Sequence, residues 1–591
     1  MANWTRERDA EDILWLTLDK PGTSANVLSR DVLLELDELL KALEGKPPRG
    51  VAVRSAKPSG FVAGADIKEF TALRSQSEAY ELVRRGQSVL DRLEGLRCPT
   101  VAAIHGFALG GGLELALACR YRVAVNDEKL SLGFPEVQLG IHPGFGGTVR
   151  SVRLIGVRPA MQLMLTGRPV RADQALRLGL VDELVPGSAE LESAARRILL
   201  APPAPRRAPL GERLLSAAAV RPLVKPVLAK QVAARARREH YPAPYAIIDL
   251  WAAHGARGPE AFEAEARSIA ELFLSSTSRN LVRVFLLQDR LKALGGKAAR
   301  DARHVHVVGA GVMGGDIAAW CALRGFEVTL QDRSAELVAP ALQRAEELFA
   351  RRLRGADKAR AARERLRGDV EGTGVPSADV VIEAIYENAD AKRELYAQLE
   401  PRMKPGALLA TNTSSIMLEP LAQRLARPSR LVGLHFFNPV AQMPLVEIVR
   451  GRDTEPAAAE AALGFARRLD KLPVPCRSAP GFVVNRVLMP YLNEAMLAAQ
   501  EGVPLPVIDE AALAFGMPMG PVELADVVGL DVASHVGVIV ATELGHAAPD
   551  LTQLQALIEA KKLGRKTGEG FYVWKDGKAV KPPRGGAQPP A

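Results

Sequence analysis

Cysteine is scarce in this sequence, with four cysteines spread over 591 residues. They stand far apart, with no Cys-x-x-Cys pair and no pair of histidines beside them, at Cys98, Cys119, Cys321 and Cys476. Disulfide frameworks and structural zinc sites both need clustered ligands, so this spacing argues against both classes and we expect no metal. Isolated thiols are typical of a reducing compartment, and we expect a cytoplasmic protein.

Long hydrophobic runs are also lacking. No uninterrupted apolar stretch reaches the roughly 18 residues that a membrane-spanning helix needs, so we expect no integral membrane segment. The charged start, MANWTRERDA, lacks the apolar stretch of a secretory signal. The sequence is 48% hydrophobic and 25% charged, which is ordinary for globular proteins. Its length suits about four domain-sized units.

Acidic residues are outnumbered by basic ones, 68 against 77, which gives a net charge of +9. Much of the excess lies in the Arg-rich segments 234–240 and 351–368. No RNP-like aromatic strand or zinc finger accompanies them, so we interpret them as solvated helix faces and expect no nucleic-acid partner. The alternative is a basic scaffold that associates with RNA or a membrane, which salt-dependent RNA binding would support.

The pattern along the chain predicts several parts. Short apolar runs alternate with helical patterns up to residue 185, which indicates α/β architecture. Proline, alanine and arginine then dominate, and 258–297 reads as one long amphipathic helical region. A strand at His304 opens a second α/β unit, and the pattern turns helical near residue 483. The predicted parts are 1–190, 191–300, 301–480, 481–577 and a disordered tail, 578–591.

A carboxylate stands in an apolar setting in the stretch FALGGGLELALAC, where Glu114 follows three glycines. Burying an unpaired carboxylate is costly, so its place needs a reason. A glycine-rich turn that leads into a helix presents free N–H groups to an anionic oxygen. A second such turn lies in 59–70, and Glu136 lies in 132–150. Two turns could hold the oxyanion of an enolate while two glutamates move a proton and a water. Close helix–strand packing is the alternative explanation of the glycines.

These three stretches together resemble the crotonase (enoyl-CoA hydratase/isomerase) superfamily over about residues 10–190. The resemblance implies that the backbone N–H groups of Ala65 and Gly111 bind the thioester oxygen of an acyl-CoA. It implies that Glu114 activates water and that Glu136 delivers a proton to Cα. Two further residues are expected near the CoA moiety, Ala63 and Lys68.

A dinucleotide fingerprint lies in 304–333, where a strand, a Gly-x-Gly-x-x-Gly turn, a helix and a second strand follow one another. The glycines, Gly309, Gly311 and Gly314, let a pyrophosphate reach the helix N-terminus. Asp332, at the end of the second strand, can accept hydrogen bonds from a ribose and would repel a 2′-phosphate. The sequence therefore favours NAD over NADP.

A histidine with a carboxylate partner is expected further on, because His435 precedes Glu447 in LHFFNPVAQMPLVEIV. With NTSS, APGFVVNR and GRKTGEGFY, this segment resembles L-3-hydroxyacyl-CoA dehydrogenases over about 303–575. The resemblance implies that His435 takes the 3-hydroxyl proton and Glu447 stabilises the imidazolium. It implies a substrate pocket with Ser414, Asn438 and Asn485. Cofactor contacts are expected from Met313, Glu387, Lys392 and Lys566.

The two resemblances fit one another, because the hydratase product is the dehydrogenase substrate. Their order resembles the multifunctional enzymes of fatty-acid β-oxidation. We therefore predict an α/β enzyme with a crotonase-like domain, a linker helix, a Rossmann NAD-binding domain and a helical C-terminal dehydrogenase domain. Long members of that family carry two helical domains and single-copy dehydrogenases dimerise, so we expect a homodimer through this domain. Isomerase activity, association with a thiolase, and short-chain or aromatic-acid substrates stay open.

Overall fold

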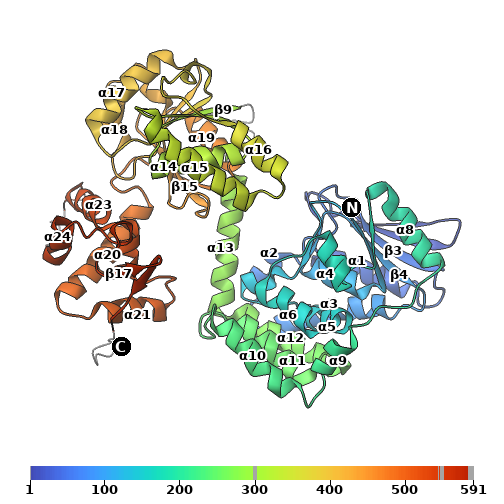
Figure 1. The fold of residues 1–591 in the computed structure, drawn as a ribbon. Helices are drawn as coiled ribbons and strands as arrows, with labels where there is room; N and C mark the ends of the chain where they lie inside the picture. The colour runs from blue at the N-terminus through green and yellow to red at the C-terminus, as the bar shows by residue number, and fades with distance from the viewer. Residues whose placement is uncertain (1, 297–301, 544, 546–550, 583–591) are drawn as a thin grey trace. The chain divides into compact units, whose positions relative to one another are not determined.

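The computed structural model describes residues 2–296, 302–543, 545 and 551–582. The chain forms two compact units, Met1–Leu286 and Leu287–Ala591, and each is described by itself. Figure 1 colours the first unit from blue to green and the second from green to red.

The first unit is built on a six-stranded sheet with the order β1-β2-β3-β4-β6-β8. Only the β1–β2 pair is antiparallel. Strands β4 and β6 are buried along their whole length, as expected for parallel strands covered on both faces. The strands are β1 (Trp4–Arg8), β2 (Ile13–Leu18), β3 (Gly50–Ser55), β4 (Thr100–Ile104), β6 (Tyr121–Val125) and β8 (Glu183–Val185).

A separate pair of short parallel strands, β5 (Phe107–Leu109) and β7 (Ser131–Gly133), positions the two predicted acids. Helix α4 (Gly111–Ala118) follows β5 and carries Glu114, while the 3-10 helix η1 (Pro135–Leu139) follows β7 and carries Glu136. Leu109 and Gly133 pair at the C-terminal ends of these parallel strands. The segments that carry the two acids therefore both begin at this end of the strand pair.

Helices surround these strands, and α12 packs against α3, α11 and α5. The remaining helices of this unit are α1 (Arg30–Lys41), α2 (Ile67–Ala72), α3 (Gln76–Glu94), α5 (Gly147–Ile155), α6 (Val157–Thr166), α7 (Ala172–Leu178), α8 (Ser188–Leu200), α9 (Leu210–Leu215), α10 (Arg221–Ala233), α11 (Pro242–His254) and α12 (Gly258–Leu274).

The predicted helical region over 258–297 is interrupted at Ser275. The structure has two helices, α12 and α13 (Ser276–Ala293), and α13 contains the boundary between the units. Ser275 separates them in an extended conformation, and its hydroxyl accepts a hydrogen bond from Ser278 N at 3.1 Å. A serine at a helix start satisfies a backbone N–H in this way, so the side chain favours a new helix over a continuous one.

The second unit contains an eight-stranded sheet with the order β11-β10-β9-β12-β13-β14-β15-β16. All neighbours are parallel except β14 and β15. The strands are β9 (His304–Val308), β10 (Glu327–Gln331), β11 (Leu366–Gly368), β12 (Val380–Glu383), β13 (Leu408–Thr411), β14 (Leu431–Phe436), β15 (Leu445–Arg450) and β16 (Leu472–Arg477).

Helices cover this sheet and then form the C-terminal part, which is orange to red in Figure 1. They are α14 (Val312–Leu323), α15 (Ala335–Arg352), α16 (Ala356–Glu364), η2 (Val375–Ser377), α17 (Ala389–Leu399), η3 (Glu400–Arg402), α18 (Leu418–Ala422), η4 (Pro428–Arg430), α19 (Pro456–Arg468), α20 (Val484–Gln500), α21 (Leu505–Phe515), α22 (Pro521–Val528), α23 (Leu530–Glu543), α24 (Thr552–Glu559) and η5 (Arg565–Thr567).

The predicted disordered tail begins too early. Residues Lys578–Val580 form strand β18, which pairs with β17 (Val573–Lys575). Lys581 follows and pairs with Asp509 at 3.0 Å and with Glu523 at 2.7 Å. Paired strands and two carboxylate partners give this segment the interactions that its composition did not predict. The rest of the predicted tail, 583–591, lies outside the described residues.

In the described part of the chain, no single helix combines the length and apolar character needed to cross a membrane. One bent pair, Pro521–Val528 with Leu530–Thr542, passes the same test by length and composition only.

Candidate active sites

The two predicted acids of the first unit lie on one cavity of about 80 Å³. Glu114 is 2% exposed, and its Oε1 accepts hydrogen bonds from Phe145 N and Gly147 N, both at 2.7 Å. Glu136 Oε2 is buried and has no hydrogen-bond partner among the described residues. A buried carboxylate oxygen without a partner is costly unless a ligand supplies one. This oxygen is therefore suited to a substrate or a water.

The predicted oxyanion amides belong to two turns that meet at this cavity. Leu109 N donates to Val62 O at 3.1 Å, which joins the first turn to β5. The turns come so close that a Cβ on Gly111 would lie 3.2 Å from Ala65 N. No described residue accepts a hydrogen bond from Ala65 N or Gly111 N. Two free N–H groups beside two acids can bind an oxygen on which negative charge develops.

The rest of the cavity wall is mostly apolar. Ala63 lines the cavity, as predicted for a residue near the substrate. Lys68 is exposed on α2 and does not line it, so its contact with CoA stays a prediction. Phe70 and Phe273 contact each other across the wall, with ring centroids 4.5 Å apart. The aliphatic lining residues include Ile67, Leu82, Val83, Leu139, Ile141 and Ile269.

Burial sets the protonation of both acids. It raises the pKa of Glu114 well above its usual range, and the neighbouring carboxylates of Glu265 and Glu136 raise it further. Burial likewise raises the pKa of Glu136, to about 8, with a smaller contribution from Glu265. With a pKa of about 8, Glu136 holds its proton at neutral pH, which suits a general acid.

Sequence reasoning missed Glu265, a third buried acid on α12. Its carboxylate accepts hydrogen bonds from Gly146 N at 2.6 Å and Thr148 N at 2.9 Å. The only signal was a glutamate on the apolar side of an amphipathic helix, beside Phe262 and Ile269. Helical periodicity tolerates one such residue, so the pattern did not single it out.

In the second unit, the glycines of the dinucleotide turn have the geometry that their motif requires. Gly309 has φ +103°, and a Cβ on it would lie 2.5 Å from Ala384 O. A Cβ on Gly314 would lie 1.8 Å from Gly309 O, so this position needs a glycine. No described atom lies within 4 Å of the position a Cβ would take on Gly311, at the N-terminus of α14. The turn and helix N-terminus therefore fit a pyrophosphate.

Asp332 lies next to this turn. Its Oδ2 accepts from Ala310 N and its Oδ1 accepts from Arg333 N, both at 2.7 Å. Each carboxylate oxygen has a second lone-pair site, which leaves acceptors for a ribose. Met313 lies in α14 and packs on the core of this unit. Lys566 pairs with Asp531 at 2.6 Å, and no described hydrogen bond joins it to the dinucleotide turn.

His435 and Glu447 are neighbours because β14 and β15 are antiparallel and these two residues are opposite each other in the register. His435 Nδ1 lies 2.6 Å from Glu447 Oε2, and the imidazole is nearly buried. Glu447 Oε1 accepts hydrogen bonds from Val483 N and Val484 N, both at 2.8 Å. Glu447 therefore accepts the Nδ1 proton, which leaves Nε2 as the basic nitrogen.

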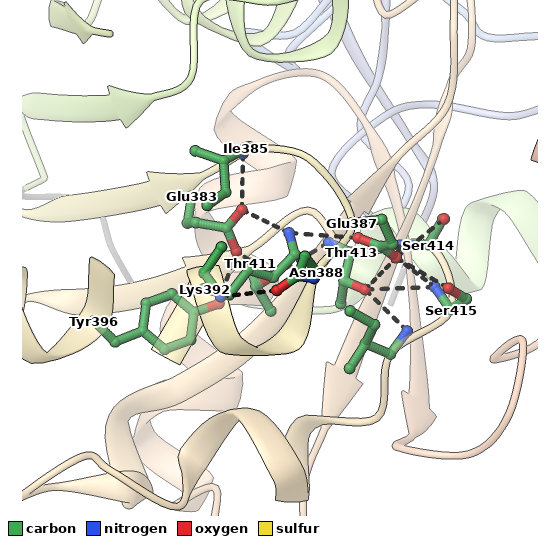
Figure 2. Close-up of polar contacts among 12 residues, drawn as sticks. Glu383, Ile385, Glu387, Asn388, Lys392, Tyr396, Thr411, Thr413, Ser414 and Ser415 are labelled. Atoms are coloured by element: carbon green, nitrogen blue, oxygen red, sulfur yellow. Dashed lines mark hydrogen bonds and ion pairs between the residues drawn. The ribbon is translucent and has the colours of Figure 1, made fainter. Parts of the chain in front are cut away.

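Figure 2 shows that Glu387 and Lys392 belong to a connected polar network. Glu387 Oε1 accepts hydrogen bonds from Ser414 N at 2.9 Å and Ser415 N at 3.1 Å. Lys392 is 1% exposed, and its amine contacts Glu383 at 2.7 Å and Glu387 at 3.4 Å. Burial alone would raise the pKa of Glu387, but Lys392 and these hydrogen bonds outweigh it and lower the pKa. Because Lys392 is enclosed, it would act on a cofactor through Glu387.

The predicted substrate residues of this site are partly brought together. Asn485 Nδ2 donates to Ser414 O at 2.9 Å, which joins α20 to the turn after β13. Asn438 is exposed after β14. Sequence reasoning missed Asn412, whose Oδ1 accepts from Phe436 N at 2.9 Å and so fixes the chain next to His435.

No group of three or more His, Cys, Asp or Glu side chains that could hold a metal ion occurs among the described residues.

Family models match most of the chain. The model for enoyl-CoA hydratase/isomerase matches residues 8–243. The model for the NAD binding domain of 3-hydroxyacyl-CoA dehydrogenase matches 304–479, and the model for the C-terminal domain of the same enzyme matches 481–574. The matches follow the chain in the order in which the two sites occur.

Solved structures similar to this chain include FadB2 of M. tuberculosis, at 35% identity over 46% of this chain and 99% of that one, with a TM-score of 0.45. (S)-3-hydroxybutyryl-CoA dehydrogenase PaaH1 from Ralstonia eutropha is 35% identical over 46% of this chain and 100% of that one, with a TM-score of 0.44. The dehydrogenase part of multifunctional enzyme 1 from C. elegans is 27% identical over 50% and 71%, with a TM-score of 0.36.

Proposed function

This chain belongs to the multifunctional β-oxidation enzymes that join an enoyl-CoA hydratase/isomerase domain to an NAD-dependent 3-hydroxyacyl-CoA dehydrogenase, and from that premise we propose the roles of its site residues. The first unit hydrates a trans-2-enoyl-CoA to an L-3-hydroxyacyl-CoA. The second oxidises that product to a 3-oxoacyl-CoA.

In the hydration step, the N–H groups of Ala65 and Gly111 bind the thioester oxygen. They stabilise the charge that develops there as the enolate forms. Glu114 accepts a proton from water through Oε2, since the described donors to this residue bind Oε1. Glu136 delivers its proton to Cα, and water adds across the double bond. The observation that carries this proposal is the meeting of two unbonded amides and two buried acids on one cavity.

For the oxidation step, bound NAD would supply the acceptor for a hydride from C3 of the substrate. The glycines of the dinucleotide turn and the N-terminus of α14 would hold its pyrophosphate, and Asp332 would accept hydrogen bonds from its ribose. His435 Nε2 takes the proton of the 3-hydroxyl, and Glu447 holds the ring and stabilises the imidazolium that forms. Ser414 and Asn485 hydrogen-bond the substrate, and Glu387 fixes the turn that carries Ser414.

Reciprocal inactivation tests these roles, because both sites lie on one chain. Glu114→Gln is expected to lower hydration of an enoyl-CoA by about 1,000-fold or more while oxidation of a 3-hydroxyacyl-CoA stays at the wild-type rate. His435→Ala is expected to do the opposite. Hydration that survives Glu114→Gln, or oxidation that survives His435→Ala, would contradict the assignment. Loss of both activities in either variant would indicate misfolding.

The same acids at the first site can also move a proton between carbons, so we propose a minor enoyl-CoA isomerase activity. A panel of acyl-CoA substrates from short to long, with aromatic ones included, separates general fatty-acid oxidation from short-chain or aromatic-acid breakdown. The product is a substrate for thiolytic cleavage, and we propose association with a thiolase, which copurification tests. All four cysteines are free, which supports our proposal of a cytoplasmic location.

We further propose a homodimer through the C-terminal helices. Several of their apolar side chains are exposed, with Val487 72% and Phe515 84% accessible. Val532 on α23 is 43% exposed. A second copy that covers these residues would remove apolar surface from water. A monomeric mass in solution at micromolar concentration would contradict this proposal.

A further inference from the structure

Two carboxylates share one turn in the first unit. Four consecutive residues, 145–148, donate their backbone N–H groups alternately to Glu114 and Glu265. Residues 145 and 147 bind Glu114 Oε1, each at 2.7 Å. Residues 146 and 148 bind Glu265, at 2.6 and 2.9 Å. The same few peptide groups therefore place both acids.

The backbone of the turn explains the alternation. Gly146 has φ +97° and caps α5, so neighbouring amides point to opposite sides of the turn. Free N–H groups at a helix N-terminus carry partial positive charge and attract carboxylates. Glu114 reaches the turn from α4 and Glu265 reaches it from α12. Removal of either carboxylate would leave two backbone N–H groups of the turn without an acceptor.

Glu265 is held by its neighbours and does not line the cavity. It is fully buried, and the Thr148 hydroxyl donates to it in addition to Thr148 N. Gln87 Nε2 donates to Glu265 Oε1 at 3.1 Å and also to the carbonyl oxygens of Gly144 and Phe262. This places α3, α12 and the turn in one hydrogen-bonded set.

We propose that Glu265 is a positioning residue of the hydratase, which fixes the 145–148 turn so that the turn holds Glu114 in its reactive orientation. The helix that supplies it, α12, lies beyond residues 8–243, the part that matches the hydratase family model. The segment that contains α12, between the hydratase and dehydrogenase parts of the chain, thus contributes to hydratase function. This inference rests on the proposed role of Glu114.

Glu265 also acts on Glu114 through its charge. The titratable and charged groups around the turn include Glu114 from α4, Glu136 from η1, His142 before the turn and Arg150 from α5. Helix α3 adds Arg84, which donates to Gln87, and Asp91 and Glu94, which pair with Arg150. The charge of Glu265 contributes to the raised pKa of Glu114. Removing that charge should lower the pKa of Glu114, so the acidic limb of the hydration pH profile should move to lower pH.

The test compares Glu265→Gln with Glu263→Gln in the full chain. Glu263 lies on the same helix, but it is partly exposed and pairs only with Arg267 among the described residues. We expect Glu265→Gln to lower kcat for hydration by about 10- to 100-fold, because small displacements of a reacting group have effects of this size. The KM for a trans-2-enoyl-CoA should stay within about two-fold, since Glu265 does not line the cavity. The acidic limb should move to lower pH, because the charge of Glu265 contributes to the raised pKa of Glu114.

Thr148→Val removes one donor to Glu265 and should have a smaller effect in the same direction. Glu263→Gln should match the wild type. Glu265→Gln with wild-type kcat and pH profile would overturn the proposal. A loss dominated by KM, or a loss with an unshifted pH limb, would also overturn it, because that result indicates a purely structural role. If the proposed role of Glu114 were wrong, the result would be different: Glu114→Gln would retain hydratase activity.

Discussion

Burying Glu114, Glu136 and Glu265 together costs folding free energy. Each carboxylate loses hydration, and each raises the cost of charging the others. The chain offsets part of this cost for Glu114 and Glu265 with backbone N–H donors, two or more to each. Glu136 Oε2 receives no such compensation from the described residues. The unpartnered carboxylate oxygen among the described residues of this group therefore belongs to the acid proposed to hand over a proton.

The pH dependence of hydration follows from these residues. Glu136 must be protonated to deliver its proton, and its pKa is raised to about 8, so we expect the rate to fall as pH rises through about 8. Glu114 must be ionised and its pKa is also raised, so the rate should fall on the acidic side as well. The measurement is kcat/KM for a trans-2-enoyl-CoA across pH. A rate that rises steadily through pH 8 would contradict the assignment.

The roles of residues could be predicted from the sequence where those residues belong to a recognisable motif. The two glutamates after glycine-rich turns and the His435–Glu447 pair were predicted, and the structure places the members of each pair together. Glu265 and Asn412 were not predicted. Their importance comes from chain segments that meet only after folding, since Glu265 contacts a turn 117 residues away.

At the scale of an element, the dinucleotide turn contains glycines of two kinds: one leaves space for a ligand, and the other permits close packing of the backbone. We expect Gly311→Ala to leave thermal stability unchanged, because its φ is −60° and no described atom lies near the new methyl group. The methyl group would occupy the space through which a pyrophosphate approaches, so the KM for NAD should rise about ten-fold. Steady-state kinetics and a melting curve measure both effects.

Gly314→Ala is the contrasting variant, since its methyl group would overlap Gly309 O and should lower the melting temperature. If Gly311→Ala left the KM for NAD unchanged, this turn would not be the cofactor site. Hydration should be unaffected in both variants.

Helix α12 also lines the first cavity through Phe273, whose ring packs on Phe70. We expect Phe273→Ala to raise kcat/KM for hexadecenoyl-CoA relative to crotonyl-CoA by about ten-fold, because the lost ring opens room for a longer chain. The control is Phe285→Ala, an exposed phenylalanine on α13. An unchanged ratio of the two substrates would place the limit on chain length elsewhere.

Elements were predictable from the sequence where hydrophobic period and motif agreed, as in the strand, turn and helix from His304 to Leu323. The break at Ser275 was missed because the apolar spacing continues across it, and one side-chain hydrogen bond decides it. Strand β18 was missed because its short, lysine-bearing sequence is stabilised by pairing with β17. The composition of a segment does not reveal whether another strand is available to pair with it.

At the scale of the whole molecule, each of the two units carries one of the proposed sites among its described residues. The first holds two acids and two amides on one cavity. The second holds a dinucleotide turn and a histidine with its carboxylate partner. One chain that carries both raises the local concentration of the shared intermediate at the second site.

The most direct measurement incubates the purified chain with a trans-2-enoyl-CoA and NAD, and follows NADH by absorbance. The account predicts NADH formation from the enoyl-CoA alone, with no added hydratase, and its loss in either Glu114→Gln or His435→Ala. Mixing those two variants should restore it. Oxidation of an added 3-hydroxyacyl-CoA without any NADH from the enoyl-CoA would contradict the claim that one chain performs both steps.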